Sequence, residues 1–142
     1  MHIAIVVSDF NQEITLELLK GALHCAQEKN ISAENIKVVH VPGAVEIPLI
    51  AKKLAKLKRY EAIIALGTVI RGETSHYDYV CDQVSMGCQS VMLEYEIPVI
   101  FGVLTCDNEE QAQARVGGVH GHKGYDAFSA ALAMIQILKN LQ

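Results

Sequence analysis

The stretch "IAIVVS", Ile3 to Ser8, decides the fold because its apolar residues follow one another without the alternation of a half-exposed strand. A continuous run of β-branched and small apolar residues is typical of a strand buried on both faces of a parallel sheet. Three further runs of this kind occur along the chain: "IKVVHV" (Ile36 to Val41), "AIIALG" (Ala62 to Gly67) and "PVIFGVLT" (Pro98 to Thr105). The sequence therefore predicts a four-stranded parallel sheet.

Segments of helical period lie between and after these runs. Between the first two runs, apolar residues recur every fourth position, at Ile14, Leu18, Ala22 and Ala26. Similar stripes, typical of helices that pack one face on a core, extend from Tyr77 to Tyr95 and from Phe128 to Leu138. Because each parallel pair of strands needs a covering connection, this order predicts an α/β fold, a three-layer α/β/α sandwich with right-handed crossovers. No repeat or linker interrupts the alternation, which indicates one domain over residues 1–142.

Composition and charge narrow the class of protein. The 142 residues are 51% hydrophobic and 20% charged, which is typical of a soluble chain with a sizeable core. A net charge of −4 argues against nucleic acid and anionic membranes as partners, since both attract concentrated positive charge. The one basic run, Lys52 to Arg59, alternates with apolar residues and is interpreted as a solvated helix face.

Metal, disulfide and targeting signals are also missing. No Cys-x-x-Cys spacing occurs among the four cysteines, Cys25, Cys81, Cys88 and Cys106. His120 and His122 are interpreted as solvated loop residues because no third metal ligand lies near them in the sequence. The opening "HIAIVV" lacks the basic region and cleavage site of a signal peptide, and no segment reaches the roughly 18 apolar residues of a membrane span. We therefore expect no metal and a cytoplasmic protein.

A polar segment follows each predicted strand. These segments are "SDFN" (Ser8 to Asn11), "VPGAVEIP" (Val41 to Pro48), "TVIRGETSH" (Thr68 to His76) and "TCDNEEQAQAR" (Thr105 to Arg115). In open parallel sheets, ligands gather beyond the carboxyl ends of the strands. The functional site is therefore expected where these four segments meet.

The third of these segments has the features of an anion site. Gly72 permits close approach of the backbone to a ligand, and Thr74 or Ser75 can cap the helix that follows. The free N–H groups of that first turn would suit a phosphate, and His76 could give and take protons beside it. In the ordinary alternative, Thr74 only caps the helix, Arg71 pairs with a surface carboxylate and His76 donates to a carbonyl. From these residues alone, both interpretations stay open.

Taken together, the segments "SDFN", "VPGAVEIP", "GTVIRGETSHYDYV", "PVIFGVLT", "EEQAQAR" and "HKGYDA" resemble the lumazine synthase family, in its order and at its spacing. The likeness extends from near residue 3 to near residue 139. It implies a flavodoxin-like version of the predicted sandwich in a transferase of riboflavin biosynthesis. The implied reaction condenses 5-amino-6-(D-ribitylamino)uracil with L-3,4-dihydroxy-2-butanone 4-phosphate to give 6,7-dimethyl-8-ribityllumazine, phosphate and water. The family needs neither a metal nor a redox cofactor.

The resemblance assigns substrate binding to Phe10, Asn11, Ala44, Val45, Glu46, Thr68, Val69, Ile70, Phe101 and Lys123. Phe10 matches the aromatic residue that stacks on the pyrimidine ring, and residues 44–46 match the segment that binds the ribityl chain. A carboxylate at Glu46 suits a polyol because each hydroxyl is a donor that needs an acceptor. Residues 68–70 match the strand end whose backbone reads the ring edge.

The resemblance assigns phosphate binding to Glu73, Thr74 and Arg115. Glu73 can contribute only its backbone N–H, so its carboxylate is expected to point away from the phosphate. Arg115 can make two parallel charge-assisted hydrogen bonds to an oxyanion. His76 resembles the residue that transfers protons, and Asp126 is a candidate partner for His76 or Lys123.

Ordinary structural roles stay open for several of these residues. Phe10 and Phe101 could be core residues. Glu46 could cap its helix or pair with a lysine of that helix. Arg115 could favour the negative end of a short helix dipole. It is the joint occurrence of the segments that favours the functional interpretation.

The resemblance implies that the partners are two small-molecule substrates and further copies of the chain. Members form homopentamers with active sites shared between neighbours. Each shared site is expected to combine Phe101, Arg115 and Lys123 from one chain with Phe10, Glu46 and His76 from the next. Some members assemble twelve pentamers into a shell of sixty subunits, and riboflavin synthase is a further protein partner that the resemblance suggests.

The chain departs from the family pattern in three places. It starts at the first predicted strand, without the leading segment that lies along a neighbouring subunit in many members, so we expect the pentamer more firmly than the shell. Asp9 replaces a basic residue common before the Phe-Asn pair, and Val45 stands where an aromatic residue is frequent. Contacts to the ribityl chain are therefore expected to be looser.

Other classes of function are also considered. A flavodoxin-like phosphate- or flavin-binding module would share the fold and the anion site without needing His76. A purely structural shell protein would keep the interfaces and lose the site. A phospho-receiver domain is the weakest alternative, because its acidic pocket needs more than Asp9 after the first strand.

Overall fold

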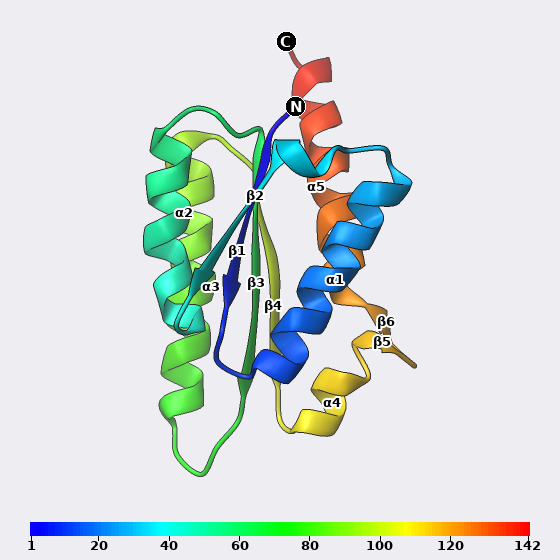
Figure 1. Cartoon of the computed structure of the whole chain (residues 1–142). Helices are drawn as coiled ribbons and strands as arrows, with labels where there is room; N and C mark the ends of the chain where they lie inside the picture. The colour runs from blue at the N-terminus through cyan, green and yellow to red at the C-terminus, as the bar shows by residue number, and fades with distance from the viewer.

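The computed structural model describes all of residues 1–142 and shows one parallel sheet between two pairs of helices (Figure 1). The sheet order is β2-β1-β3-β4. Its strands are β1 (Ile3–Ser8), β2 (Ile36–Val41), β3 (Ala62–Ile70) and β4 (Val99–Cys106). All three strand pairs are parallel, so every carboxyl end lies at the same edge of the sheet.

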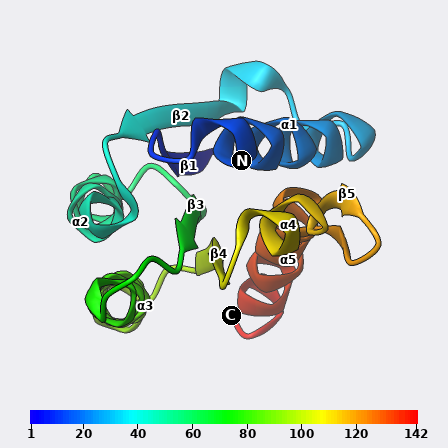
Figure 2. The same cartoon turned by 90° about the horizontal axis from the view of Figure 1, so that it is seen from below.

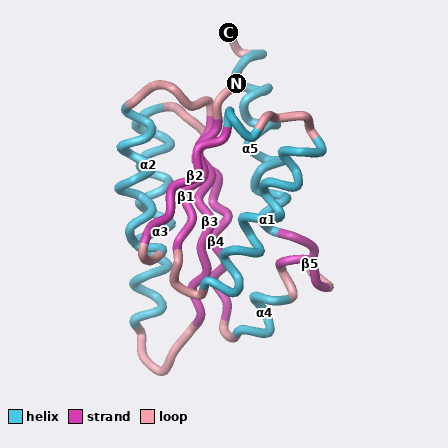
Figure 3. The backbone as a smooth tube through the Cα atoms, viewed as in Figure 1, coloured by secondary structure: helices cyan, strands magenta, loops and turns pink.

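The helices form the two outer layers; Figure 2 shows α2 and α3 end-on on one side, apart from α1 and α5. The helical elements are α1 (Gln12–Glu28), α2 (Ile47–Lys56), α3 (His76–Tyr95), the short α4 (Glu109–Gln113) and α5 (Lys123–Asn140). Two 3₁₀ turns, η1 (Ala33–Asn35) and η2 (Ala44–Glu46), flank β2. Helices α1 and α5 cover one face of the sheet, and α2 and α3 cover the other, as the tube in Figure 3 also shows. None of these helices combines the length and the apolarity needed to cross a membrane.

The alternation of side chains along β1 divides the core into two clusters. Ile5 and Val7 pack toward α1 and α5, whereas Ala4 and Val6 pack toward α2 and α3. Every residue of β1 is buried, as the continuous apolar run predicts. Phe128 of α5 is fully buried in the first cluster. Burial of such a side chain contributes about 1.5–3 kcal/mol to folding.

The structure confirms the predicted three-layer sandwich and its four-stranded parallel sheet. Two details of the strand predictions are wrong. β3 continues past Gly67 to Ile70, because its last residues still pair with β4 up to Cys106. β2 and β4 are not fully covered on both faces, because they form the two edges of the sheet: β2 leaves Lys37 and His40 exposed, and β4 leaves Phe101 and Thr105 exposed.

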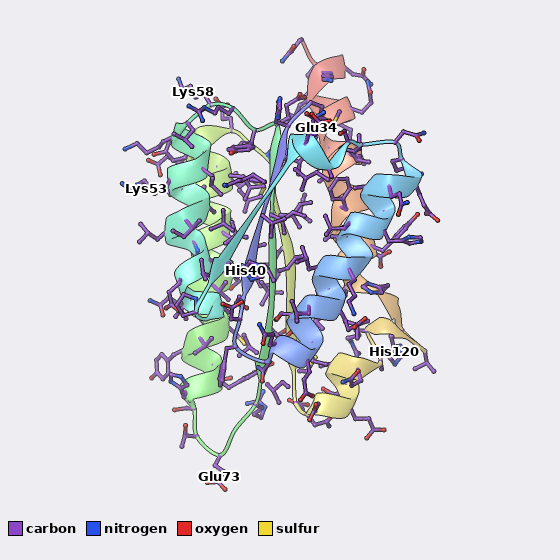
Figure 4. All side chains as sticks on the ribbon, viewed as in Figure 1. Glu34, His40, Lys53, Lys58, Glu73 and His120 are labelled. Carbon is purple, nitrogen blue, oxygen red and sulfur yellow. The ribbon has the colours of Figure 1, made fainter.

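A small antiparallel hairpin, β5 (Val116–Gly118) with β6 (Gly121–His122), lies between α4 and α5. The positive φ of Gly117 (106°) lies at the register shift between Val116 and Gly118, and that of Gly121 (78°) directly follows the turn at residues 119–120. The prediction that His122 is a solvated loop residue is wrong, because its Nδ1 accepts hydrogen bonds from the first turn of α5. His120, in the turn, is exposed (Figure 4).

We expect Phe128→Ala to lower the free energy of unfolding by about 3–5 kcal/mol, because it removes a fully buried aromatic ring and leaves a cavity. Urea denaturation at fixed protein concentration measures this loss. Gln136→Ala on the exposed side of the same helix is the control and should change stability by less than about 0.5 kcal/mol. Equal losses for the two variants would contradict the assignment of Phe128 to the core.

Candidate active site

The first hollow, of about 350 Å³, lies at the carboxyl ends of β1 and β3. Three chain segments, which follow β1, β2 and β3, converge on it because their parallel strands end at one edge. Its lining includes these residues of the predicted site: Phe10, Asn11, Ala44, Val45, Thr68, Val69, Ile70, Thr74 and His76. The segments "SDFN", "VPGAVEIP" and "TVIRGETSH" therefore meet at one place.

A larger hollow of about 510 Å³ lies at the opposite end of the sheet. Residues that precede β3 and β4, among them Tyr60 and Pro98, line it together with the end of α5. It is shallow and contains none of the predicted site residues. We therefore assign the chemistry to the smaller hollow at the carboxyl ends of the strands, where parallel sheets bind ligands.

The end of β3 offers backbone hydrogen-bonding groups to the first hollow. Pairing with β1 stops at Leu66, while pairing with β4 continues to Ile70, so residues 68–70 have no strand partner on the β1 side. The Nδ2 of Asn11 donates to the carbonyl oxygen of Thr68 at 2.9 Å. Apart from the Thr68 carbonyl, which accepts from Asn11, the backbone N–H and C=O groups on this side of residues 68–70 can hydrogen-bond to the polar edge of a planar ring.

Phe10 stands at the mouth of the first hollow with 62% of its surface exposed, so it is not a core residue. Backbone hydrogen bonds hold this turn against the end of β2: Asp9 N donates to Val41 O at 2.8 Å, and Phe10 N donates to Pro42 O at 2.9 Å. The exposed ring is therefore fixed at its backbone and free on its face, which suits it to stack on an aromatic ligand.

Glu46 has a capping role that the sequence left as an alternative. Its Oε1 accepts a hydrogen bond from Gly43 N at 2.8 Å, and no lysine of α2 pairs with it. Glu46 is half-buried and lies beside the hollow rather than among its lining residues. One carboxylate oxygen is thus occupied by the turn, and the other has no hydrogen-bond partner within the chain.

Arg71 braces the loop between β3 and α3. Its Nε donates to Asp107 Oδ1 at 2.9 Å, and the guanidinium lies 4.2 Å from the ring centre of Tyr77. The hydrogen bond to Asp107, with lesser help from the charge of Asp78, raises the pKa of Arg71. Arg71 therefore has the ordinary partner that the sequence analysis considered, a surface carboxylate.

The residues beyond Arg71 shape the start of α3. Thr74 Oγ1 accepts from His76 N at 3.3 Å, whereas the Ser75 side chain makes no capping hydrogen bond. Glu73 stands at the tip of the loop with its side chain directed away from the body of the protein (Figure 4), and it does not line the hollow. The ring of His76 lines the hollow and makes no hydrogen bond within the chain, so both of its nitrogens are available to a ligand.

A second hollow, of about 250 Å³, lies along the outer edge of β4. It contains Phe101, which is 42% exposed and therefore not a core residue, and the two cations Arg115 and Lys123. The guanidinium Nη1 of Arg115 donates to Gln111 O at 2.8 Å, and this bond holds the side chain against the end of α4. This edge of the sheet thus combines an aromatic face with two positive charges.

The two hollows share no residue. His76 lines the first and Arg115 lines the second, so a single chain does not bring the two together in one cavity. Asp126, in the first turn of α5, is exposed and forms no hydrogen bond or ion pair with His76 or Lys123. No group of three or more His, Cys, Asp or Glu side chains is placed to hold a metal ion.

Comparison with known proteins decides the family. The family model described as 6,7-dimethyl-8-ribityllumazine synthase matches residues 1–139. The chain belongs to the lumazine synthase family. A protein of Coxiella burnetii (strain Dugway 5J108-111) named 6,7-dimethyl-8-ribityllumazine synthase is 59% identical over 99% of this chain and 93% of its own length. Proteins of the same name from strains CbuG_Q212 and RSA 493 are 58% identical over the same shares.

Membership of the lumazine synthase family confirms the predicted family and the predicted function, a transferase of riboflavin biosynthesis. It also agrees with the flavodoxin-like arrangement of the sheet and helices. The phospho-receiver domain and the flavin-binding module are therefore set aside.

The sequence analysis missed some residues of the first hollow. Tyr77, Val80 and Gly43 line it, although the first two read as part of the apolar stripe of α3. Burial raises the pKa of Tyr77 and of Cys81, one turn further along α3, so both stay protonated at neutral pH. The sequence gives one signal for Tyr77, its position directly after His76. The first turn of a helix that starts at the edge of a sheet can contact both the core and a ligand, so a neighbour of His76 could also line the hollow.

We expect Asn11→Ala to destabilise the protein by about 1–3 kcal/mol, because it leaves the Thr68 carbonyl without its partner and places alanine at a φ of 61°. Asn30→Ala is a matched control, since Asn30 also has a φ of 61° and its side chain makes no hydrogen bond. Urea denaturation should show that Asn11→Ala costs about 1 kcal/mol more than Asn30→Ala. The role of the Asn11 amide would be disproved by equal costs.

Proposed function

We propose that the first hollow of one subunit and the second hollow of its neighbour together form the active site. The observation that carries this proposal is the division of the predicted residues between two separate hollows, each with a half-exposed phenylalanine. Neither hollow alone contains both the residue for proton transfer and the arginine for phosphate. A second copy of the chain supplies the missing half when its β4 edge approaches the first hollow.

The first hollow binds 5-amino-6-(D-ribitylamino)uracil. Phe10 stacks on the pyrimidine, and the open backbone of residues 68–70 hydrogen-bonds to its edge. Residues 44–46 receive the ribityl chain, with the second oxygen of Glu46 as the acceptor for a hydroxyl. Phe101 and Lys123 of the neighbouring subunit close over the ring from the other side.

The phosphate of L-3,4-dihydroxy-2-butanone 4-phosphate lies at the start of α3. The Thr74 hydroxyl and the backbone N–H groups of the loop, including that of Glu73, hold it from one subunit. Arg115 of the neighbouring subunit binds it by two charge-assisted hydrogen bonds. The exposed Glu73 carboxylate points away, which keeps like charges apart.

The chemistry needs orientation and proton transfer more than a strong nucleophile. The aromatic amine of one substrate attacks the ketone of the other, and one water leaves as the imine forms. Phosphate is then eliminated, and the ribitylamino nitrogen attacks the remaining carbonyl, so that ring closure releases a second water and completes the lumazine. His76 takes and returns protons in these steps. Holding both reactants in one cavity removes several kcal/mol of entropic barrier, whereas general acid–base catalysis contributes about two to four powers of ten in rate.

The assembly is a homopentamer in the cytoplasm. An apolar stripe at seven-residue spacing supports contact with further copies: Tyr79, Met86 and Leu93 of α3 are 69%, 69% and 66% exposed. Exposed apolar side chains on one helix face are typical of a surface that another chain covers. Assembly of pentamers into a shell of sixty subunits, and association with riboflavin synthase, extend this proposal to larger complexes.

We expect His76→Ala to leave a slow but measurable enzyme, with a rate lowered about 10²- to 10⁴-fold, because orientation of the substrates survives. The assay mixes the two substrates with purified protein and follows the absorbance of the lumazine product. His2→Ala, at an exposed position outside both hollows, is the control and should keep the full rate. Complete loss of activity in a folded His76→Ala protein that still binds both substrates would refute the dominance of orientation.

The shared site predicts complementation between two strongly impaired variants. His76→Ala and Arg115→Ala chains are unfolded together, refolded as a mixture and assayed at low phosphate-substrate concentration. Random mixing at equal amounts should restore about a quarter of the sites, because each such site takes His76 from one kind of chain and Arg115 from the other. If the mixture shows only the average of the two separate variants, both residues act within one chain and the shared site is wrong.

A further inference from the structure

His122 occupies the junction between the hairpin and the last helix. It is the last residue of β6 and the N-cap of α5, in extended backbone conformation. Its Nδ1 accepts hydrogen bonds from Gly124 N at 3.2 Å and from Tyr125 N at 3.3 Å. Two of the free N–H groups at the start of α5 are thereby satisfied by one imidazole. The helix turn that carries Lys123 is therefore held by this ring.

The same ring packs against α1. A Cβ built at Gly21, in the middle of α1, would overlap the imidazole of His122. Glycine in a helix interior destabilises the helix by about 1 kcal/mol relative to alanine. The benefit of Gly21 is the space that it leaves for the ring. The backbone of α5 also approaches α1 closely, because a Cβ at Gly124 would overlap the carbonyl of Leu18. The ring thus joins the start of α5 to the middle of α1.

The hairpin connects this junction to the two cations of the second hollow. Lys123 N donates to the carbonyl oxygen of Arg115 at 2.8 Å, and Val116 pairs with His122 across the hairpin. Arg115 and Lys123 are therefore neighbours through the backbone. A two-stranded hairpin alone is marginally stable in water, so its position depends on an anchor.

We propose that His122 is a positioning residue for the reaction: it anchors the hairpin and the start of α5 to α1 and so fixes Arg115 and Lys123 at the second hollow. This inference rests on the role proposed above for the second hollow. His122 does not line either hollow, so it acts through the two cations. A displacement of about 1 Å at groups that orient a substrate can lower the rate about 100-fold.

Two substitutions at position 122 separate the two roles of the side chain, the N-cap hydrogen bonds and the packing of the ring against α1. His122→Ala removes the acceptor and should raise KM for the phosphate substrate about ten- to hundredfold, with a small change in KM for the pyrimidine amine. His122→Asn keeps an N-cap acceptor but lacks the ring that packs against α1 at Gly21, so it should recover only part of the loss. A role in stability alone would instead lower kcat through the fraction of folded enzyme and leave both KM values unchanged.

The contact with Gly21 allows a double-mutant test. Gly21→Ala should displace the ring and reproduce the rise in KM for the phosphate substrate. The same substitution in the His122→Ala background adds a methyl group where the ring no longer lies, and should have little further effect. Additive effects of the two substitutions would overturn the proposed contact. If Gly21→Ala alone fails to fold, the double variant should fold again, because the ring that clashes with the added methyl group is gone; failure of both variants to fold would overturn the contact.

Amide hydrogen exchange gives a readout independent of activity. In His122→Ala, exchange at Lys123, Gly124 and Tyr125 should be at least about tenfold faster, because their hydrogen bonds depend on the anchor. His120→Ala, in the exposed turn of the same hairpin, is the matched control and should change neither exchange nor KM.

The outcomes separate this inference from the proposed function. Faster exchange with unchanged KM for the phosphate substrate would show that His122 is a structural cap only and overturn the proposal. Unchanged exchange would overturn it as well. Absence of lumazine formation by the wild-type protein would refute the proposed function itself, and with it any positioning role of His122.

Discussion

The structure depends on the unequal pairing of β3, whose carboxyl end continues beside β4 after its pairing with β1 has stopped. Parallel strands end at one edge, so the segments after β1, β2 and β3 must meet there. Because β1 ends before β3, a space is left beyond its carboxyl end, and this space is the first hollow. Without the additional length of β3, the turn at Phe10 and the start of α3 would have no backbone edge between them.

Much of the fold could be predicted because its signals are local. The limits of β1 and β2 follow from continuous runs of apolar residues, and the stripe at Ile14 and Leu18 identifies the buried face of α1. The end of β3 could not be predicted from the residue pattern, because Thr68 to Ile70 belong to the strand only through pairing with β4; the family resemblance alone placed them at a strand end. The polar residues Lys37 and His40 are a local signal of exposure in β2, but its place at the edge depends on the order of the strands.

The candidate site could be predicted as a set of segments but not as a geometry. Phe10 and Phe101 are apolar and read equally well as core residues, and their exposure depends on where the surrounding turns and strand edges lie. The cap that Glu46 makes with Gly43 is a local pattern that the sequence left open, whereas the partner of Arg71, Asp107, lies on a distant segment that no local pattern reveals.

His122 is the clearest failure of local reasoning. A glycine-rich segment around a histidine is typical of a loop, and the residue that decides otherwise, Gly21, lies in a distant helix. Helix propensity shows that glycine is unfavourable at position 21, but it does not show which residue occupies the space that the absent side chain leaves. Contacts of this kind between segments far apart in sequence are visible only in three dimensions.

The exposed edge of β2 has a consequence for solubility. A strand with no neighbour on one side presents unpaired N–H and C=O groups that an extended segment of another molecule can join. Lys37 and His40 interrupt the apolar character of this strand with polar, solvated side chains. The positive charge of Lys37 opposes the pairing of two identical β2 edges, so the chain resists aggregation through this strand.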